Sequence, residues 1–304
     1  MDIQDIFTYL AFNNSVHISS IDDFDNLNEL LDTNFAENGL LLSDDDPLEQ
    51  AVKETIQDEA FGTKFDEGLT RKALELGIYP MATIKRITNF KEAMECGITP
   101  EAMAEAIGGT RMLYADIPTF KHHSKKLIIP FDRLHITKKL KGWLKGKFAD
   151  YTITFNRNFD LCIEELLKAY PETWITKNLI KQYKKIHENP DDKVSVDSVE
   201  IWHNGKLVAG EIGFITRNAY ASLSGFHNED DIGTVQMCVL GLFLKNNGFA
   251  YWDLGMELEY KYRYGAVACN RNEQKEYYSR LENKKAEFPK EETPLSSFLE
   301  YLKP

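Results

Sequence analysis

The stretch DSVEIWHNGKLVAGEIGF, residues 197–214, decides the fold of the second half of the chain. Two segments rich in β-branched and apolar residues flank the pair Asn204-Gly205, and Asn-Gly in this setting is the strongest short-range signal for a two-residue β-hairpin. The flanking strands, 197–202 and 206–215, are therefore expected to pair antiparallel. A sheet built around this hairpin has an antiparallel centre.

The sequence on both sides of the hairpin alternates between strand-like and helix-like patterns. Further strands are expected at 149–155, 219–224 and 249–254, and helices at 158–169, 176–187, 234–246 and 272–283. This order predicts an α+β fold in which a mixed, largely antiparallel sheet is flanked by helices. We assign this domain to residues 121–304.

Residues 1–120 are predicted to form a smaller, acidic and mainly helical N-terminal domain. The first 60 residues contain fifteen Asp or Glu and one Lys. Asp46-Pro47 is a helix start, because Asp can cap the first N–H groups and Pro suits the first helical position. Two interpretations fit the acidic segment: a solvated segment that favours solubility, or a nucleic-acid mimic that covers a basic surface.

Composition limits the class of protein. With 304 residues, 43% of them hydrophobic, the chain can bury the cores of two units. The four cysteines are scattered, without CxxC or Cys/His pairs, which predicts reduced thiols and neither a disulfide framework nor a metal site. The N-terminus lacks a basic region, and the longest apolar run, Val239–Leu244, is too short to cross a bilayer. We therefore expect a cytoplasmic protein without membrane attachment.

A basic stretch interrupts the acidic average. The net charge is −12, yet residues 121–147 hold eight Lys and one Arg against a single acid, Asp132. One interpretation is a solvated helix face. The other is a surface that contacts nucleic-acid phosphates, with Trp143 available for stacking on a base.

Several chemistries lack their motifs. There is no P-loop, GxGxxG, HExxH or EF-hand sequence, and YASLSGF, 220–226, lacks the glycine that precedes the serine of a nucleophile elbow. The predicted sheet suits an acyl-CoA acetyltransferase. However, the loop HNEDDIGT, 227–234, carries three acids and no Lys or Arg, so it would repel the diphosphate of CoA.

Five blocks in a fixed order resemble the leucyl/phenylalanyl-tRNA-protein transferase family. A weaker match is GIYPMA, 77–82. The blocks are IIPFDRLHITKKLK (128–141), ETWITKNLIKQYKKIH (172–187), DSVEIWHNGKLVAGEIGF (197–214), YASLSGF (220–226), and YWDLGM with YGA within 251–266.

The resemblance implies an acetyltransferase-like domain that uses aminoacyl-tRNA in place of acyl-CoA. Such an enzyme, a monomer without a further cofactor, moves an amino acid, Leu or Phe by family default, onto the N-terminal amine of an acceptor protein and marks it for degradation by the N-degron pathway. The basic stretch would then hold the tRNA acceptor stem through Lys138, Lys139, Lys141, Lys145 and Lys147.

The resemblance also assigns site residues. Asp253 falls at the reaction centre, where it would orient the attacking amine or help to deprotonate it; otherwise its carboxylate would cap local backbone amides. Met81 and Trp174 would line the site of the terminal adenosine, although Trp174 also suits an ordinary core. The aminoacyl pocket is expected from Glu211, Tyr220, Ser222, Leu223, Met237, Leu240, Leu244 and Trp252, although the helical stripe among them is also typical of a core.

The chain departs from the family pattern at four positions. Gly255 replaces the family Gln two residues after the aspartate, Leu223 replaces a Glu, and Met81 stands where Trp is frequent. Glu211 occupies a position that is commonly apolar, so the transferred residue could be Arg or Lys; alternatively Glu211 faces outward and pairs with a lysine. These losses also leave open a non-catalytic adaptor that binds tRNA or N-termini.

Overall fold

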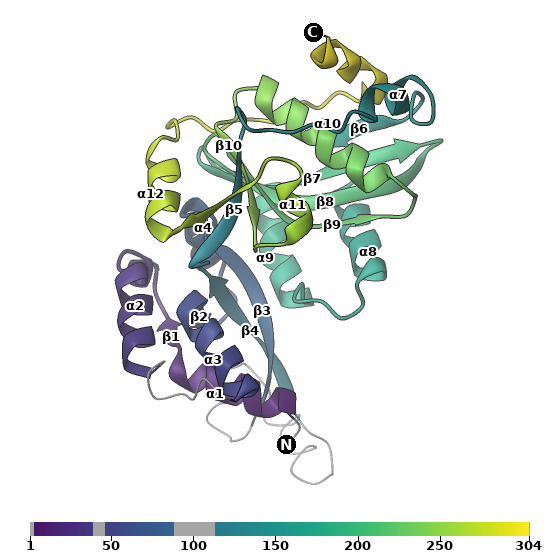
Figure 1. The fold of residues 1–304 in the computed structure, drawn as a ribbon. Coiled ribbons are helices and arrows are strands. Elements are labelled where there is room, and N and C mark those ends of the chain that lie inside the picture. The colour runs from purple at the N-terminus through teal and green to yellow at the C-terminus, as the bar shows by residue number, and fades with distance from the viewer. Residues whose placement is uncertain (1–2, 39–45, 88–112, 304) are drawn as a thin grey trace. The chain divides into compact units, whose positions relative to one another are not determined.

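The structure is a computed structural model that describes residues 3–38, 46–87 and 113–303 (Figure 1). The chain forms two compact units, the first from Met1–Ser124 with Trp174–Lys185, the second from Lys125–Thr173 with Ile186–Pro304. The inclusion of 174–185 in the first unit was not predicted. Two hydrogen bonds attach this segment there: Tyr183 Oη donates to the Pro80 carbonyl (2.5 Å), and Asn178 Nδ2 donates to Asp116 (2.9 Å).

The first unit is mainly helical and also contains a four-stranded sheet in the order β1-β2-β4-β3. Asp46 caps α3 as predicted, because its carboxylate accepts from Leu48 N at 2.7 Å. The elements are α1 (Ile3–Asn14), β1 (Val16–Ile18), η1 (Ile21–Phe24), α2 (Leu27–Asn38), α3 (Pro47–Asp58), β2 (Glu59–Gly62), α4 (Glu67–Glu75), β3 (Tyr79–Arg86), β4 (Tyr114–Lys121) and the first part of α9 (Lys177–Glu188).

The second unit contains an eight-stranded sheet in the order β11-β5-β10-β9-β8-β7-β6-β12. Only β10 and β9 pair in parallel within this sheet, so the predicted mixed, largely antiparallel α+β fold is confirmed. The elements are β5 (Lys125–Pro130), α7 (Leu140–Lys145), β6 (Thr152–Phe155), α8 (Phe159–Ala169), β7 (Val194–His203), β8 (Lys206–Thr216), β9 (Ala219–His227), α10 (Ile232–Asn246), β10 (Tyr251–Gly255), α11 (Glu259–Tyr262), β11 (Val267–Asn270), α12 (Arg271–Ser279), β12 (Thr293–Pro294) and η3 (Leu295–Leu302).

The central hairpin forms as predicted. Asn204 and Gly205 both have positive φ angles, 49° and 74°, and His203 pairs with Lys206. Both central residues of a type I′ turn need this left-handed backbone, which Asn and Gly tolerate best. The turn therefore fixes the register of β7 against β8, the two longest strands of the sheet.

Helices α8 and α10 cover opposite faces of this sheet (Figure 1). Neighbouring residues of β8 show why: a Cβ at Gly210 would contact Cys162 of α8, whereas the Glu211 side chain meets Gln236 of α10. Successive side chains of a strand point to opposite faces. The close approach at Gly210 lets α8 pack against the strand, and Glu211 is turned toward α10.

The basic stretch is not one helix, so only the part of it in α7 can form a solvated helix face. Residues 125–130 form the buried strand β5, and only 140–145 form α7. Pro130 ends the strand, since it offers no N–H to the ladder. None of the helices in the described ranges is both long and apolar enough to span a membrane.

Candidate functional site

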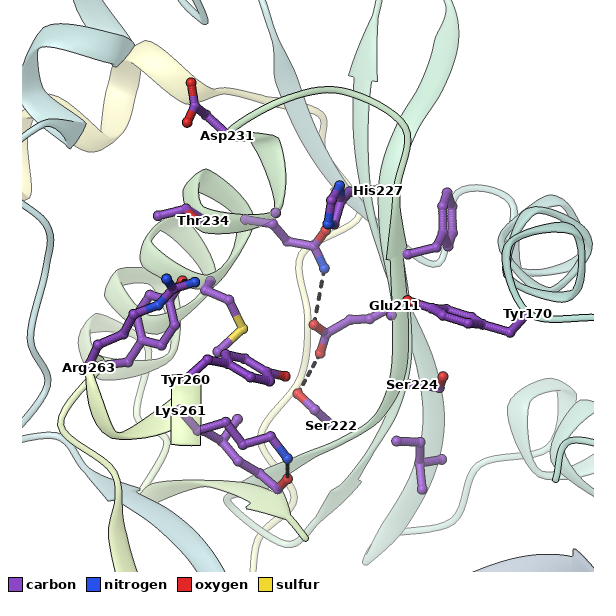
Figure 2. A pocket seen from close by; sticks show the side chains of 18 residues that line it. Tyr170, Glu211, Ser222, Ser224, His227, Asp231, Thr234, Tyr260, Lys261 and Arg263 are labelled. Carbon is purple, nitrogen blue, oxygen red and sulfur yellow. Dashed lines mark hydrogen bonds between the residues drawn. The ribbon is translucent and has the colours of Figure 1, made fainter. Parts of the chain in front are cut away.

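A cavity of about 460 Å³ lies in the second unit among β8, β9, α10 and the segment around α11 (Figure 2). Strand β8 contributes Glu211, and the neighbouring strand β9 contributes Ser222 and Leu223. Gln236 and Met237 come from α10, on the opposite wall. The volume is in the range of small-molecule binding sites.

Glu211 is an unusual residue in the cavity wall, because it is acidic and only 4% exposed. Its Oε1 accepts hydrogen bonds from Tyr220 Oη (2.8 Å) and Ser222 Oγ (2.7 Å), and its Oε2 accepts one from Gln236 Nε2 (3.0 Å). Burial raises the pKa of this carboxyl above its ordinary value, and the three donors oppose that shift. The alternative of an outward-facing Glu211 paired with a lysine is wrong.

The other predicted pocket residues fall into three groups. Ser222, Leu223 and Met237 line the cavity with Glu211. Behind this surface, Tyr220 donates to Glu211 and Trp252 Nε1 donates to Ser222 Oγ at 2.9 Å, so both hold residues that line the cavity. The remaining two, Leu240 and Leu244, are fully buried in the hydrophobic core and do not line it.

The residues that close the cavity on the side of α11 were not predicted from the sequence. Tyr260, Lys261 and Arg263 all line it, and Figure 2 shows the Tyr260 ring beside Glu211. Tyr170, at the end of α8, adds a second aromatic wall. Tyr260, Lys261 and Arg263 have a signal in the sequence, the stretch EYKYR (259–263), where aromatic and basic residues alternate after β10.

Lys261 is a buried lysine in this wall, 7% exposed. Its Nζ donates to the carbonyl oxygens of Leu254 (2.6 Å) and Met256 (2.8 Å). Burial lowers the pKa of Lys261 to about 8, and the carboxylates of Asp253 and Glu211 limit the shift. A neutral amine has two N–H groups and one lone pair. The two carbonyls therefore satisfy both donors of the neutral form.

Asp253 does not line the cavity, although its neighbour Leu254 does. Its carboxylate is buried, with Oδ2 accepting from Lys126 Nζ at 2.5 Å and Oδ1 accepting from Gly255 N at 2.9 Å. The second bond is the local backbone cap considered as an alternative above. A catalytic role for Asp253 stays a prediction.

The basic stretch reaches the cavity through Lys147. Its Nζ pairs with the carboxylate of Asp231 (3.0 Å) and donates to the Asp230 carbonyl (2.8 Å), and Asp231 lines the cavity. The predicted tRNA-contacting lysines are all exposed: Lys138, Lys139, Lys141, Lys145 and Lys147. This exposure is compatible with both interpretations of the stretch.

Met81 and Trp174, the predicted adenosine contacts, belong to the first unit, where both are half-buried. Met81 lies in β3 opposite Thr119. Their predicted role stays a prediction. Across the described ranges, no three His, Cys, Asp or Glu side chains are grouped so that they could hold a metal ion.

The cavity lies beside the parallel pair β9–β10 of a mixed, largely antiparallel sheet flanked by helices, the α+β architecture that the sequence predicted. A family model for leucyl/phenylalanyl-tRNA protein transferase matches residues 128–282, about half of the chain. The chain belongs to this family. The matched range contains the central hairpin and every residue named as lining the cavity.

Similar proteins carry the same name. The leucyl/phenylalanyl-tRNA--protein transferase of Solidesulfovibrio magneticus is 30% identical over 155 residues, covering 49% of this chain and 59% of that protein. The one of Pseudomonas fluorescens SBW25 is 30% identical over 152 residues, covering 49% and 64%. That of Flavobacterium johnsoniae is 25% identical over 163 residues, covering 52% and 73%. The chain thus spans less than two thirds of the first two relatives.

Proposed function

We propose that this protein is a cytoplasmic aminoacyl-tRNA-protein transferase that moves an amino acid from tRNA to the N-terminal amine of acceptor proteins and marks them for degradation. Leu or Phe is the default cargo by family. Aminoacyl-tRNA and acceptor N-termini are the partners, and no other cofactor takes part.

One observation carries the proposal. Segments of the matched range that are far apart in sequence meet around one cavity. The basic stretch contacts the rim of that cavity through the ion pair of Lys147 with Asp231. An aminoacyl group in the cavity would have its RNA beside exposed lysines, whose charges attract phosphates without reading sequence. An acyl-CoA would place its diphosphate beside the carboxylates of Asp230 and Asp231, whose negative charges would repel it.

The reaction needs little chemistry from the protein. The acceptor amine forms a bond to the ester carbonyl carbon, and the bond from that carbon to the ribose oxygen of tRNA breaks. The amine loses a proton and the ribose oxygen gains one. Because an α-amine has a pKa of about 8, placement and a modest proton acceptor are sufficient.

Two groups are candidates for the proton acceptor. Asp253 is the residue that the family resemblance assigns, but both of its oxygens already accept hydrogen bonds from Lys126 and Gly255. Lys261 lines the cavity, and its lowered pKa of about 8 leaves a minor part of the amine neutral at neutral pH, far more than an ordinary lysine has. If Lys261 accepts the proton, Lys261→Met lowers the transfer rate far more than Asp253→Asn does in protein that is equally folded.

Labelled transfer tests the proposal directly. Purified full-length protein is incubated with tRNA charged with labelled amino acids and with peptides of varied N-terminus, and label on the peptide is measured. Transfer to the N-terminal amine, abolished by N-terminal acetylation of the peptide, supports the proposal. No transfer from a complete set of charged tRNAs contradicts it.

A non-catalytic adaptor is the second candidate, because Gly255 and Leu223 replace two polar residues of the family pattern. An adaptor binds charged tRNA or peptide but transfers no label. The same assay, combined with a filter-binding measurement of tRNA, separates the two candidates.

A further inference from the structure

The buried carboxylate of Glu211 has no cation of the described chain in direct contact with it. Burying a carboxylate is unfavourable unless a cation or several donors compensate it. The three donors to Glu211, from Tyr220, Ser222 and Gln236, are all neutral. No ion pair found among the described residues includes Glu211, so no cation of the described chain lies in direct contact with it.

One oxygen of Glu211 has room for a further donor. A carboxylate offers about four lone-pair sites. Oε1 accepts two hydrogen bonds, whereas Oε2 accepts one, from Gln236. In Figure 2 the Glu211 carboxylate points from β8 into the cavity, between α10 and Tyr260. A ligand in the cavity can therefore reach Oε2.

The nearest cation in the wall is directed elsewhere. Lys261 Nζ donates to the Leu254 and Met256 carbonyls, and its positive charge acts on Glu211 only from beyond ion-pair distance. Arg263, also in the wall, is exposed and donates to Tyr264 Oη at 3.0 Å. Neither residue satisfies Oε2.

The rest of the wall suits the stem of a long cationic side chain. Tyr170, Leu223, Met237 and Tyr260 present aromatic and aliphatic surface to the cavity. Methylene groups of Lys or Arg pack well on such surface, and a guanidinium or ammonium interacts favourably with tyrosine faces. A purely apolar cargo such as a leucyl group would leave Glu211 Oε2 with Gln236 as its single donor and would bury the carboxylate further.

Resting on the proposed transfer function, we propose that the cavity selects a cationic aminoacyl side chain, arginyl or lysyl, whose terminal nitrogen binds Glu211 Oε2. Glu211 is then a specificity residue for the transferred amino acid. A cationic donor adds an attraction between opposite charges that the three neutral donors already present do not provide.

The test compares cargo that differs only in charge. tRNAs are charged with arginine, lysine, leucine, phenylalanine and citrulline, the neutral isostere of arginine, and kcat/KM for transfer to one acceptor peptide is measured with full-length protein. We expect arginine or lysine to exceed citrulline and leucine by about tenfold or more, because a site built for a polar group rejects analogues that lack it. This comparison needs no variant.

Variants then assign the preference to one carboxylate. Glu211→Gln is expected to lower kcat/KM for arginine to the level of citrulline, and to reduce kcat/KM for leucine by a smaller factor than that for arginine. The control Glu259→Gln alters an exposed glutamate of α11 that does not line the cavity, and is expected to keep the preference.

Three results overturn the inference. Wild-type protein that moves leucine or phenylalanine at least as well as arginine and lysine contradicts it and leaves the proposed function intact. Equal loss of arginine and leucine transfer in Glu211→Gln shows that Glu211 binds the α-amine common to all cargo. If nothing is transferred, the proposed function fails, and calorimetry with the arginine and leucine amides of 3′-amino-adenosine tests the subsite alone. In that case equal or absent binding overturns it, whereas tighter binding of the arginine amide supports it.

Discussion

Removing the charge of Asp253 is expected to destabilise the second unit strongly. Asp253→Asn keeps the shape of the side chain and can still accept from Gly255 N. However, it takes away the negative charge that lies 2.5 Å from Lys126 Nζ, in a pair whose side chains are only 7% and 5% exposed. Losing one partner of a buried ion pair costs about 3–5 kcal/mol, since the remaining charge stays buried.

Urea denaturation followed by tryptophan fluorescence measures this cost. With a slope of about 2–3 kcal/mol per molar urea, the midpoint of the transition should fall by roughly 1–2 M. Lys126→Met should cost a similar amount. The double variant Lys126→Met with Asp253→Leu should recover most of the loss, because replacing both charges by apolar groups is often close to neutral.

A neighbouring exposed pair provides the matched control. Lys125 Nζ lies 2.7 Å from Glu257 with side chains 55% and 38% exposed, and Lys125→Met should leave the urea midpoint almost unchanged. If Asp253→Asn and Lys126→Met each cost no more than the control, the reasoning from burial is refuted. If Asp253→Asn keeps full stability and abolishes transfer, Asp253 acts in the reaction, as the family resemblance implies.

Three further outcomes are expected. Replacing Lys138 and Lys141 by Ser should weaken tRNA binding and reduce the slope of log affinity against log salt by about one per lysine that contacts a phosphate, measured by filter binding; an unchanged slope makes them a solvated face only. Burial lowers the pKa of Lys261 in the folded protein to about 8, below its ordinary 10.5, so the unfolded chain binds one more proton between these two pH values. The free energy of unfolding of the wild type should therefore rise with pH in this window relative to that of Lys261→Met. Parallel curves of stability against pH contradict this. Gly255→Ala, at φ 63°, should cost about 1–2 kcal/mol, whereas Gly142→Ala in α7 should be neutral or stabilising; equal effects would disprove the strain.

The framework of the second unit could be predicted because its signals are local. The Asn204-Gly205 turn specifies a hairpin through two backbone angles, and the flanking strands follow from their composition. The first unit's sheet was missed because β3 and β4 each contain a proline, Pro80 and Pro118, which normally argues against a strand. Both strands form nevertheless, paired antiparallel along their whole length.

The cavity was harder to predict than the strands, since lining depends on which side chains the tertiary fold turns inward. Met237, Leu240 and Leu244 share one helical stripe, yet only Met237 reaches the cavity and the other two fill the core. Lys261 was missed for the opposite reason. A lysine in a charged, aromatic segment is expected to be exposed to solvent. In the fold, however, Lys261 is buried and its Nζ donates to two backbone carbonyls.

The loss of the family Gln at Gly255 and the burial of Lys261 are two parts of one local arrangement. Gly255 has a left-handed backbone at the point where the register of β10 against β5 shifts, so any larger residue would be strained there. The residues on either side of it, Leu254 and Met256, provide the two carbonyls that hold Lys261 Nζ. Restoring Gln at 255 would therefore strain the turn that positions this lysine. It follows that an amine on α11, and not an amide at the end of β10, is the polar group that this chain presents to its cavity beside Leu254.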